Sequence, residues 1–427
     1  MAGSNTQSRP YFYGYTLVGY SFAICFLASA FFLHARGVFF PHWIADFGVS
    51  KTELSLAVSL TLFTGSCCAP LTGFLIDRLP LRYIICFACC WLTVGYLLMR
   101  GVDTYLGLLL VLIPFQGIGW TGVGPLVQTK LMVNWFSRNR GMALGVALMG
   151  MSVAGVIIPP LNTFLAENYG WRNAYAVYAG CLIFIAIPLT LLLVRQKPDD
   201  IGQHPDGEEP DPSAPAADAP NTTGTAASGW SVYREFLTSS AYWSVVLTFG
   251  LMNGVYSAMV THLPTYLTTE LTFSLYDGAY LLTIAGAFAI GGKIVFGWMM
   301  DHLPAKITVM AGVVAYIFST ITLIFAQSYA LLMVAAALFG LGFGGMVPVR
   351  SVIISRLFGI DKFSRANGLL SFFLAPATFW VLLTGYIVDQ IGTYTAAFQV
   401  WTVAFALAGC VSLIVKLPNH NSQPLPA

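Results

Sequence analysis

Charged residues are scarce in this sequence, and their scarcity excludes most soluble proteins. Only 9% of the 427 residues are Asp, Glu, Lys or Arg, whereas 57% are hydrophobic. An average soluble domain contains about 25% charged residues. The net charge of +2 at pH 7 is small, and the basic residues are spread between apolar runs, which argues against nucleic-acid binding. A chain of this composition is expected in a lipid bilayer.

Cysteine is missing from the loops, which excludes an external disulfide framework. All eight cysteines lie inside apolar runs, where a thiol behaves as a small hydrophobic group. The spacing of Cys86 and Cys89 fits a metal or redox motif, but no histidine or acidic residue accompanies the pair in its run. We therefore predict neither a metal site nor a cofactor.

Acidic residues are absent from the interiors of the apolar runs, whereas basic residues are not. An intramembrane enzyme would need an acid, a metal cluster or a nucleophile pair there, so we predict that the chain is not an enzyme. Burying an unpaired cation costs at least about 2.5 kcal/mol on insertion scales, so each buried base is a functional candidate whose partner could be an anionic substrate. The bases within or near apolar runs are His34, Arg36, Lys130, His262, Lys293 and Arg350.

Long apolar runs fill most of the sequence. A membrane-spanning helix needs about twenty predominantly apolar residues. We predict an all-α polytopic membrane protein with twelve spans, at residues 13–39, 54–76, 83–99, 105–133, 141–166, 172–194, 241–265, 277–300, 307–326, 329–355, 366–388 and 394–416.

Most lysines and arginines outside the spans fall on one side of this topology. Only Lys51, Arg100 and Arg172 fall on the other side. Because short cytoplasmic loops carry an excess of Lys and Arg, we predict an integral protein of a cell membrane, inner or plasma, with both termini cytoplasmic.

One hydrophilic stretch, residues 195–240, interrupts the spans. It is rich in Pro, Asp, Glu, Ala and Thr and cannot bury enough apolar surface to fold alone. We predict a cytoplasmic linker that joins an N-terminal six-helix bundle (residues 1–194) to a C-terminal six-helix bundle with a short tail (residues 241–427).

Two segments of the first half recur in the second. GFLIDRLPLR at 73–82 returns as GWMMDHLPAK at 297–306, displaced by 224 positions, and GIGWTGVGP at 117–125 returns as GLGFGGMVP at 340–348, displaced by 223. The glycine runs also fit the dinucleotide fingerprint, which needs a preceding strand that is absent here, so close helix packing explains them better. The two repeated segments together indicate two parallel six-helix repeats.

The first repeated segment resembles the motif G-x-x-x-D-R-x-G-x-R of the major facilitator superfamily, with Pro80 where the family usually has glycine. The glycines would let neighbouring helices approach closely, and the acids could pair with basic groups or a helix N-terminus in a cytoplasmic latch that breaks when the halves rock. Plain topogenic charge is the alternative. The predicted latch residues are Gly73, Asp77, Arg78, Arg82, Arg138, Arg140, Gly297, Asp301, Lys306 and Arg365.

Within that superfamily the sequence is most similar to the monocarboxylate transporter family and its bacterial relatives, which include oxalate/formate exchangers. The matching segments are residues 134–145, 197–207 and 292–297. The resemblance implies that Lys293 binds substrate where the family usually has Arg. Lysine provides a point charge in place of a planar fork. The alternative for Lys293 is a lysine that extends to the cytoplasmic interface.

His34 aligns with a family lysine implicated in proton and substrate binding. A histidine that titrates near pH 6.5 could accept a proton and then attract the anion. Two arginines, Arg36 and Arg350, are further candidates for the substrate site, with an interfacial role as the alternative. Three aromatic residues could also line the site, with packing against neighbouring helices as the alternative: Trp120, Tyr256 and Phe372.

The sequence therefore predicts a secondary active transporter of a small organic anion that works by alternating access. Leu374 stands where the dicarboxylate exchangers have a second cation, which favours a monocarboxylate. The expected partners are the bilayer, the anion and, with coupling, a proton, and the expected functional unit is a monomer. An anion exchanger for dicarboxylates, an exporter of neutral or amphipathic compounds and a transport-inactive sensor remain alternatives.

Overall fold

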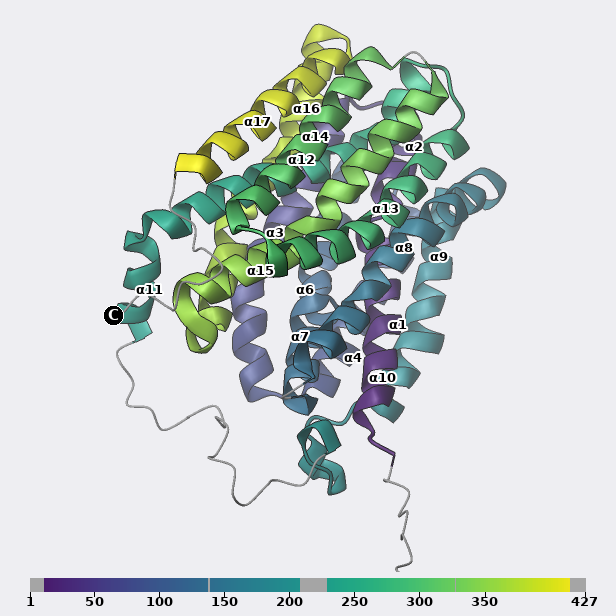
Figure 1. Ribbon diagram of the computed structural model, residues 1–427. Helices are drawn as coiled ribbons and strands as arrows, with labels where there is room; N and C mark the ends of the chain where they lie inside the picture. Colours follow the sequence, from purple (N-terminus) through teal and green to yellow (C-terminus); the bar gives the residue numbers. More distant parts are fainter. Residues whose placement is uncertain (1–10, 137–138, 208–228, 327, 415–427) are drawn as a thin grey trace, which may run out of the picture.

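The protein is a bundle of membrane-length helices (Figure 1). The computed structural model describes residues 11–136, 139–207, 229–326 and 328–414. In these residues twelve helical segments are long and apolar enough to cross a membrane, which confirms the predicted number. The spans run over Gly14–Phe47, Lys51–Arg78, Leu81–Gly101, Tyr105–Trp135, Gly141–Tyr169, Trp171–Leu193, Ser240–Thr269, Leu275–Met300, Ala305–Phe325, Tyr329–Gly359, Arg365–Ile391 and Tyr394–Leu413.

Several spans consist of more than one helix. The N-terminal half contains α1 (Gly14–Phe32), α2 (Ala35–Phe47), α3 (Lys51–Arg78), α4 (Leu81–Leu98), α5 (Tyr105–Val111), α6 (Gly119–Val123), α7 (Pro125–Trp135), α8 (Arg140–Tyr169), α9 (Trp171–Cys181) and α10 (Ile187–Leu193). The C-terminal half contains α11 (Gly229–Thr238), α12 (Ser240–Thr269), α13 (Leu275–His302), α14 (Ala305–Phe325), α15 (Tyr329–Phe373), α16 (Trp380–Ile391) and α17 (Tyr394–Ile414). Short π-helices at Leu112–Ile118 and Leu182–Ala186 interrupt the fourth and sixth spans.

The second and eighth spans begin with the same local signal. Ser50 caps α3 by accepting the Glu53 N–H at 3.1 Å, and Glu53 accepts the Ser50 N–H at 2.8 Å. Ser274 and Asp277 form the same capping box at the start of α13. Such a box satisfies backbone donors that a helix start would leave unpaired. The two boxes are 224 positions apart, so the sequence repeat extends to the helix starts.

The two halves meet along helix pairs that approach at the level of the backbone. A Cβ on Gly37 of α2 would collide with the Val260 carbonyl of α12, and one on Gly385 of α16 would lie 2.7 Å from the Lys51 carbonyl of α3. A Cβ on Gly286 of α13 would lie 2.7 Å from the carbonyl carbon of Gly155 on α8. Small residues permit such close crossings in membrane proteins. These three contacts form the glycine seam of the protein.

The glycine runs of the fourth and tenth spans pack closely, as the sequence predicts. A Cβ on Gly117 would lie 2.8 Å from the Thr61 carbonyl, and one on Gly340 would collide with the Ala285 carbonyl. By contrast, a Cβ on Gly73 or Gly297 would meet nothing within 4 Å. The close helix approach predicted at Gly73 and Gly297 is therefore absent from this structure.

Hydrogen bonds between the halves lie away from the linker end, defined as the end of the bundle with Asp77 and Val194. Asp389 of α16 accepts the backbone N–H of Thr52 at 2.7 Å and its hydroxyl at 2.6 Å, at the start of α3. Deeper in, Ser59 donates its hydroxyl to the Thr378 carbonyl at 3.0 Å. In the described part of the chain, hydrogen bonds between the halves occur in the middle of the bundle and at this far end. The far end is therefore held shut.

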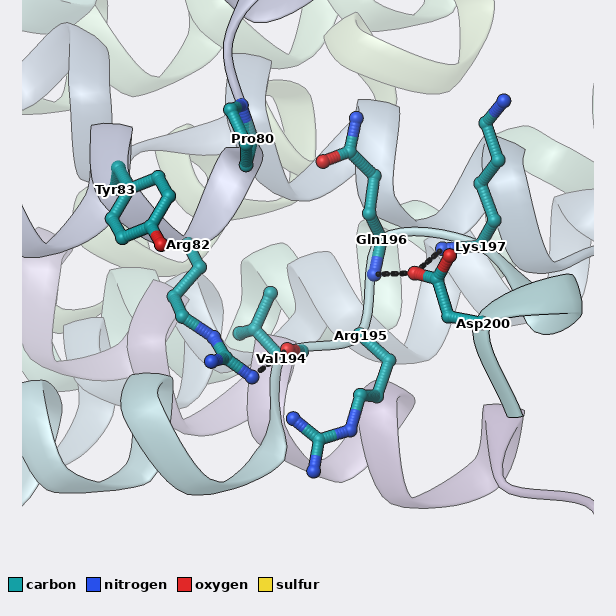
Figure 2. Close-up of a pocket in the computed structure, with 8 residues that line it drawn as sticks. All are labelled: Pro80, Arg82, Tyr83, Val194, Arg195, Gln196, Lys197 and Asp200. Carbon is teal, nitrogen blue, oxygen red and sulfur yellow. Dashed lines mark hydrogen bonds between the residues drawn. The ribbon is translucent and has the colours of Figure 1, made fainter.

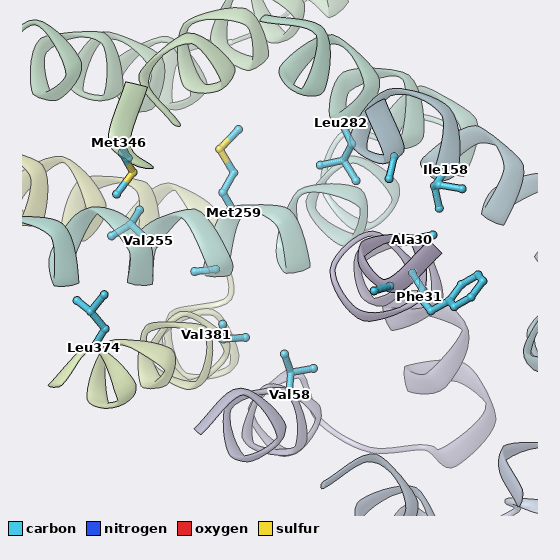
Figure 3. Close-up of a cluster of buried hydrophobic side chains, with 14 of the residues drawn as sticks. Ala30, Phe31, Val58, Ile158, Val255, Met259, Leu282, Met346, Leu374 and Val381 are labelled. Atoms are coloured by element: carbon cyan, nitrogen blue, oxygen red, sulfur yellow. The ribbon is translucent and has the colours of Figure 1, made fainter. Parts of the chain in front are cut away.

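Buried apolar side chains of both halves lie in the middle of the bundle (Figure 3). Ala30 and Val58 come from the first half, and Met259 and Val381 from the second. These side chains are almost fully buried and belong to one hydrophobic cluster that includes residues of both halves.

The predicted linker contains more structure than its composition suggests. Residues 195–207 include two short 3-10 helices, and α11 occupies part of the stretch that was expected to be unstructured. The Phe236 ring is fully buried against Phe358 of α15, with ring centroids 4.9 Å apart. Glu235 of α11 forms an ion pair with Lys362 at 2.7 Å. The α11 helix is therefore docked on the C-terminal half.

Candidate functional site

The first span is interrupted between α1 and α2, and two buried basic side chains lie at the interruption. The α1 helix ends at Phe32, α2 begins at Ala35, and His34 lies between them. His34 is 8% exposed and Arg36 is 5% exposed. Interrupted membrane helices commonly line the binding sites of transporters because the broken backbone is tolerated only inside the protein.

Arg36 is a buried cation for which the described residues provide no carboxylate partner. Its Nε and Nη1 atoms are buried and have no hydrogen-bond partner among the described residues. Its guanidinium lies over the Phe32 ring, 4.8 Å from the centroid, and within electrostatic reach of Tyr256 and Tyr175. A cation–π contact offsets only part of the cost of burying a cation, so the free N–H groups can still bind an anion.

Aromatic residues of both halves, Phe32 and Tyr256, lie near Arg36, and each stacks on a further ring. In the first half, Phe32 stacks on Trp120, with centroids 4.4 Å apart and planes 8° from parallel. In the second half, Tyr256 stacks on Phe343 at 3.5 Å and 3°. The close crossing of Gly37 with Val260 explains this meeting, because Arg36 is next to Gly37 and Tyr256 is one helical turn before Val260.

One turn of α8 connects His34 with Lys293. The imidazole of His34 packs against Gly155, where a Cβ would lie 3.4 Å from Nε2, and it also contacts the Met151 backbone. Three residues before Gly155, the Ser152 hydroxyl accepts a hydrogen bond from Lys293 Nζ of α13. His34 Nε2 is buried and without a hydrogen-bond partner among the described residues. Two predicted site residues therefore flank the same helical turn, one from each half.

Two other predicted site residues lie away from this group. Arg350 follows Phe343 by seven residues on α15, so it lies on the same helix face about 10 Å nearer the linker end. Its Nε atom is buried and without a partner among the described residues. Phe372 is 43% exposed and contacts Phe373, with ring centroids 5.6 Å apart. No contact joins Phe372 to Arg36 or Lys293 within the described ranges.

The predicted latch residues of the first half make contacts within their own half. Asp77 forms an ion pair with Lys130 at 3.0 Å, and the Arg82 guanidinium donates to the Val194 carbonyl at 2.9 Å. Arg78 lies over the Phe74 ring at 3.9 Å. Lys130 is the base that pairs with Asp77, whereas the sequence marked Lys130 only as a possible partner of an anionic substrate.

In the second half, Lys306 donates to the Leu413 carbonyl at 2.8 Å, which repeats the contact of Arg82. Arg365 is exposed. Arg138 lies outside the described residues, and for Arg140 and Asp301 only the backbone is described. A latch between the halves at the linker end therefore stays a prediction.

Several polar residues at the site were not identified from the sequence. Ser152 is the partner of Lys293, and buried Gln116 donates to the Tyr175 hydroxyl at 3.4 Å while its own Oε1 has no partner among the described residues. Gln116 lies in the π-helix of the fourth span, and π-helical turns are frequent at functional sites. An uncharged amide inside an apolar run was the available signal for Gln116, whereas Ser152 carried none.

The sequence and the fold are both similar to those of known proteins. Residues 21–327 and 281–423 match the family model of the Major Facilitator Superfamily. The chain belongs to this superfamily. Its structure is similar to a bacterial homolog of the human lysosomal transporter Spinster, in an inward-facing and unoccupied conformation, with a TM-score of 0.72 and 16% identity over 95% of this chain and 97% of that one. At this identity the likeness supports the fold alone.

Among curated members of the superfamily, the chain is 25% identical to monocarboxylate transporter 13 of Rattus norvegicus, over 91% of this chain and 86% of that protein. It is also 25% identical to monocarboxylate transporter 12 of Mus musculus, over 91% and 83% of the two chains. The glycerol-3-phosphate transporter of Bacillus subtilis (strain 168) is 25% identical over 67% of this chain and 66% of its own length. Members of the superfamily are membrane transporters, and the chain is one of them.

Proposed function

We propose that this protein is a secondary active transporter of a small organic anion, a monocarboxylate, and that Arg36 is the cation that binds the carboxylate. The observation that carries the proposal is the buried guanidinium of Arg36, whose Nε and Nη1 lack partners among the described residues. A guanidinium presents paired N–H donors that fit the two oxygens of a carboxylate. An anion at this position would supply the missing hydrogen bonds and the missing charge.

The position of Arg36 between the halves supports transport by alternating access. Arg36 belongs to the first half, and Tyr256 and Phe343 belong to the second. An anion held among them contacts both halves, so its binding free energy depends on how the halves are arranged. Lys293 and His34 lie at another contact between the halves, that of α8 with α13, and supply a second cation and a candidate proton acceptor.

The names of the relatives agree with this substrate class. The curated relatives include monocarboxylate transporters, and the relative from Bacillus subtilis is a transporter of glycerol-3-phosphate, which is also an organic anion. We assign the linker end and both termini to the cytoplasm, since Lys and Arg concentrate there. The far end, held by Asp389 and the glycine seam, is then the closed external gate, and the conformation faces the cytoplasm.

Uptake of a labelled small monocarboxylate into proteoliposomes tests the role of Arg36. Arg36→Gln should lower saturable uptake at least about 30-fold, because losing a hydrogen-bonded charge partner costs about 2 kcal/mol or more. Arg36→Lys should retain part of the affinity, since it keeps the charge and loses the fork. Arg100→Gln is the matched control, because Arg100 is an exposed arginine at the far end.

Normal affinity and rate in folded Arg36→Gln would exclude Arg36 as the carboxylate ligand. Arg350 favours one alternative, a dicarboxylate bound by two arginines, because its buried Nε also lacks a partner among the described residues. Two results together would favour that alternative. The wild type would exchange a dicarboxylate but show no monocarboxylate uptake, and Arg350→Gln would lose the dicarboxylate exchange.

A further inference from the structure

A basic pocket lies on the outer surface of the first half, at the linker end (Figure 2). Its volume is about 450 Å³. It lies where the third span begins and the sixth span ends, away from Arg36 and the contact between the halves. The lining residues are Pro80, Arg82, Tyr83, Val194, Arg195, Gln196, Lys197 and Asp200.

Positive charge dominates this pocket. Three of its lining residues are cations, and Asp200 is its one acid. The Asp200 carboxylate is already engaged by the backbone N–H groups of Gln196 and Lys197, both at 3.0 Å. Figure 2 shows the guanidinium groups of Arg82 and Arg195 projecting to the same side, whereas Lys197 points away. Two arginines therefore face a common space, and the one acid of the described pocket lining is bound to backbone N–H groups.

The N-terminus of α4 adds to this positive potential. Pro80 is the N-cap of this 18-residue helix and provides no side-chain cap for the first N–H groups. The start of a helix of this length carries about half a positive charge and favours anions. Arg82 uses one N–H group for the Val194 carbonyl, and the Arg195 side chain makes no hydrogen bond or ion pair with any described residue.

The backbone around the pocket is fixed before any ligand binds. Trp135 Nε1 donates to the Arg195 carbonyl at 2.9 Å, and Asn134 Nδ2 donates to the Gln196 carbonyl at 3.1 Å. These bonds hold the chain that carries Arg195 against the end of the fourth span. A preorganised site loses less conformational entropy on binding.

Apolar side chains continue from the pocket along the outer face of the bundle. Tyr83 and Phe87 of α4 are 65% and 66% exposed, and Leu192 of α10 is 67% exposed. In a membrane protein such side chains contact lipid chains, and an exposed tyrosine at the start of a span is typical of the headgroup level. A ligand with a phosphate at the pocket and an acyl chain beside Phe87 fits both surfaces.

We propose that this pocket binds the phosphate of an anionic phospholipid, with Arg82 and Arg195 as its ligands. Basic pockets between spans on the cytoplasmic side are suited to such headgroups. The site is separate from the proposed anion-transport site, and the two proposals can fail independently.

Binding of phosphatidylglycerol with a labelled acyl chain to the purified full-length protein in detergent tests the proposal. Arg195→Gln should weaken binding about tenfold, the loss expected for one charge-assisted hydrogen-bonding partner. Arg195→Lys should lose less, because it keeps the charge. Arg234→Gln removes an exposed cation of α11 outside the pocket and should bind like the wild type. Phosphatidylcholine with the same acyl chains should bind more weakly and without dependence on Arg195.

Thermal unfolding of each variant shows whether it is folded, and Arg195→Gln leaves the backbone contacts of Arg195 available. Equal weakening in Arg195→Gln and Arg234→Gln would overturn the proposal in favour of diffuse charge attraction. Wild-type binding by folded Arg195→Gln would overturn it as well. If inorganic phosphate alone saturates the pocket with the same dependence on Arg195, while phosphatidylglycerol does not compete, the ligand is a soluble phosphate and the lipid assignment is wrong.

Discussion

A single methyl group at the glycine seam should open the far end of the protein. Gly385 lies where α16 crosses α3, and a Cβ there would lie 2.7 Å from the Lys51 carbonyl and closer still to the Ser55 hydroxyl. The Lys51 carbonyl belongs to the helix backbone and cannot turn aside like the end of a side chain. Gly385→Ala must therefore separate the two helices, and with them the two halves.

The size of the effect follows from the cost of overpacking. Inserting a methyl group into a tight contact costs about 1–3 kcal/mol. This cost applies only while α16 and α3 touch, so the ratio of far-end-open to far-end-closed molecules should rise about 5- to 150-fold. The bonds from Thr52 to Asp389 lie at the same crossing and favour the closed far end in wild type and variant alike, so they set the starting ratio and leave the expected fold-change as it is.

Distances between spin labels can measure this opening. Labels at Asn168 in the first half and Gln390 in the second half would report on the far end, since both residues are exposed. In Gly385→Ala the population with the longer distance should increase. Gly19→Ala is the control, because a Cβ at Gly19 of α1 meets nothing within 4 Å. An unchanged distance distribution in folded Gly385→Ala would refute the idea that this crossing holds the far end shut.

Two further predictions concern the contact between α8 and α13. Lys293→Ala should abolish saturable monocarboxylate uptake while the protein still inserts, because it removes the cation beside Ser152; Lys293→Arg should retain uptake, and normal affinity in Lys293→Ala would exclude a substrate role. His34→Gln should flatten the response of initial uptake to external acidification, because glutamine cannot accept the proton that His34 would carry near Arg36 and Gly155; a normal pH response would exclude His34 from proton coupling.

The spans could be predicted because composition and length determine them, whereas the contacts of the site depend on how the helices pack. The break before Ala35 has no glycine or proline at Leu33 or His34, so no local signal marked it. The first span extends to Phe47, so the predicted end at residue 39 was too early.

The partners of the candidate charges could not be derived from one sequence. Lys130 and Asp77 are 53 positions apart, and Lys293 and Ser152 are 141 positions apart. Both pairs form only when the helices are assembled. The family resemblance assigns substrate binding to Lys293, yet its Nζ has a hydroxyl partner, whereas the Nε and Nη1 of Arg36 have none among the described residues. Whether a buried cation already has a hydrogen-bond partner depends on how the helices pack, and this criterion favours Arg36 over Lys293 as the substrate cation.

The bonds from Arg82 to the Val194 carbonyl and from Lys306 to the Leu413 carbonyl repeat one device in both halves. In each half, the basic side chain at the start of the third span donates a hydrogen bond to a carbonyl at the end of the sixth span. The third and sixth spans of each half are therefore held together at the linker end. Loss of either hydrogen bond should weaken the packing within that half and leave the motion between the halves unchanged. The repeated motif would then preserve the shape of each moving part, and gating would depend on contacts elsewhere.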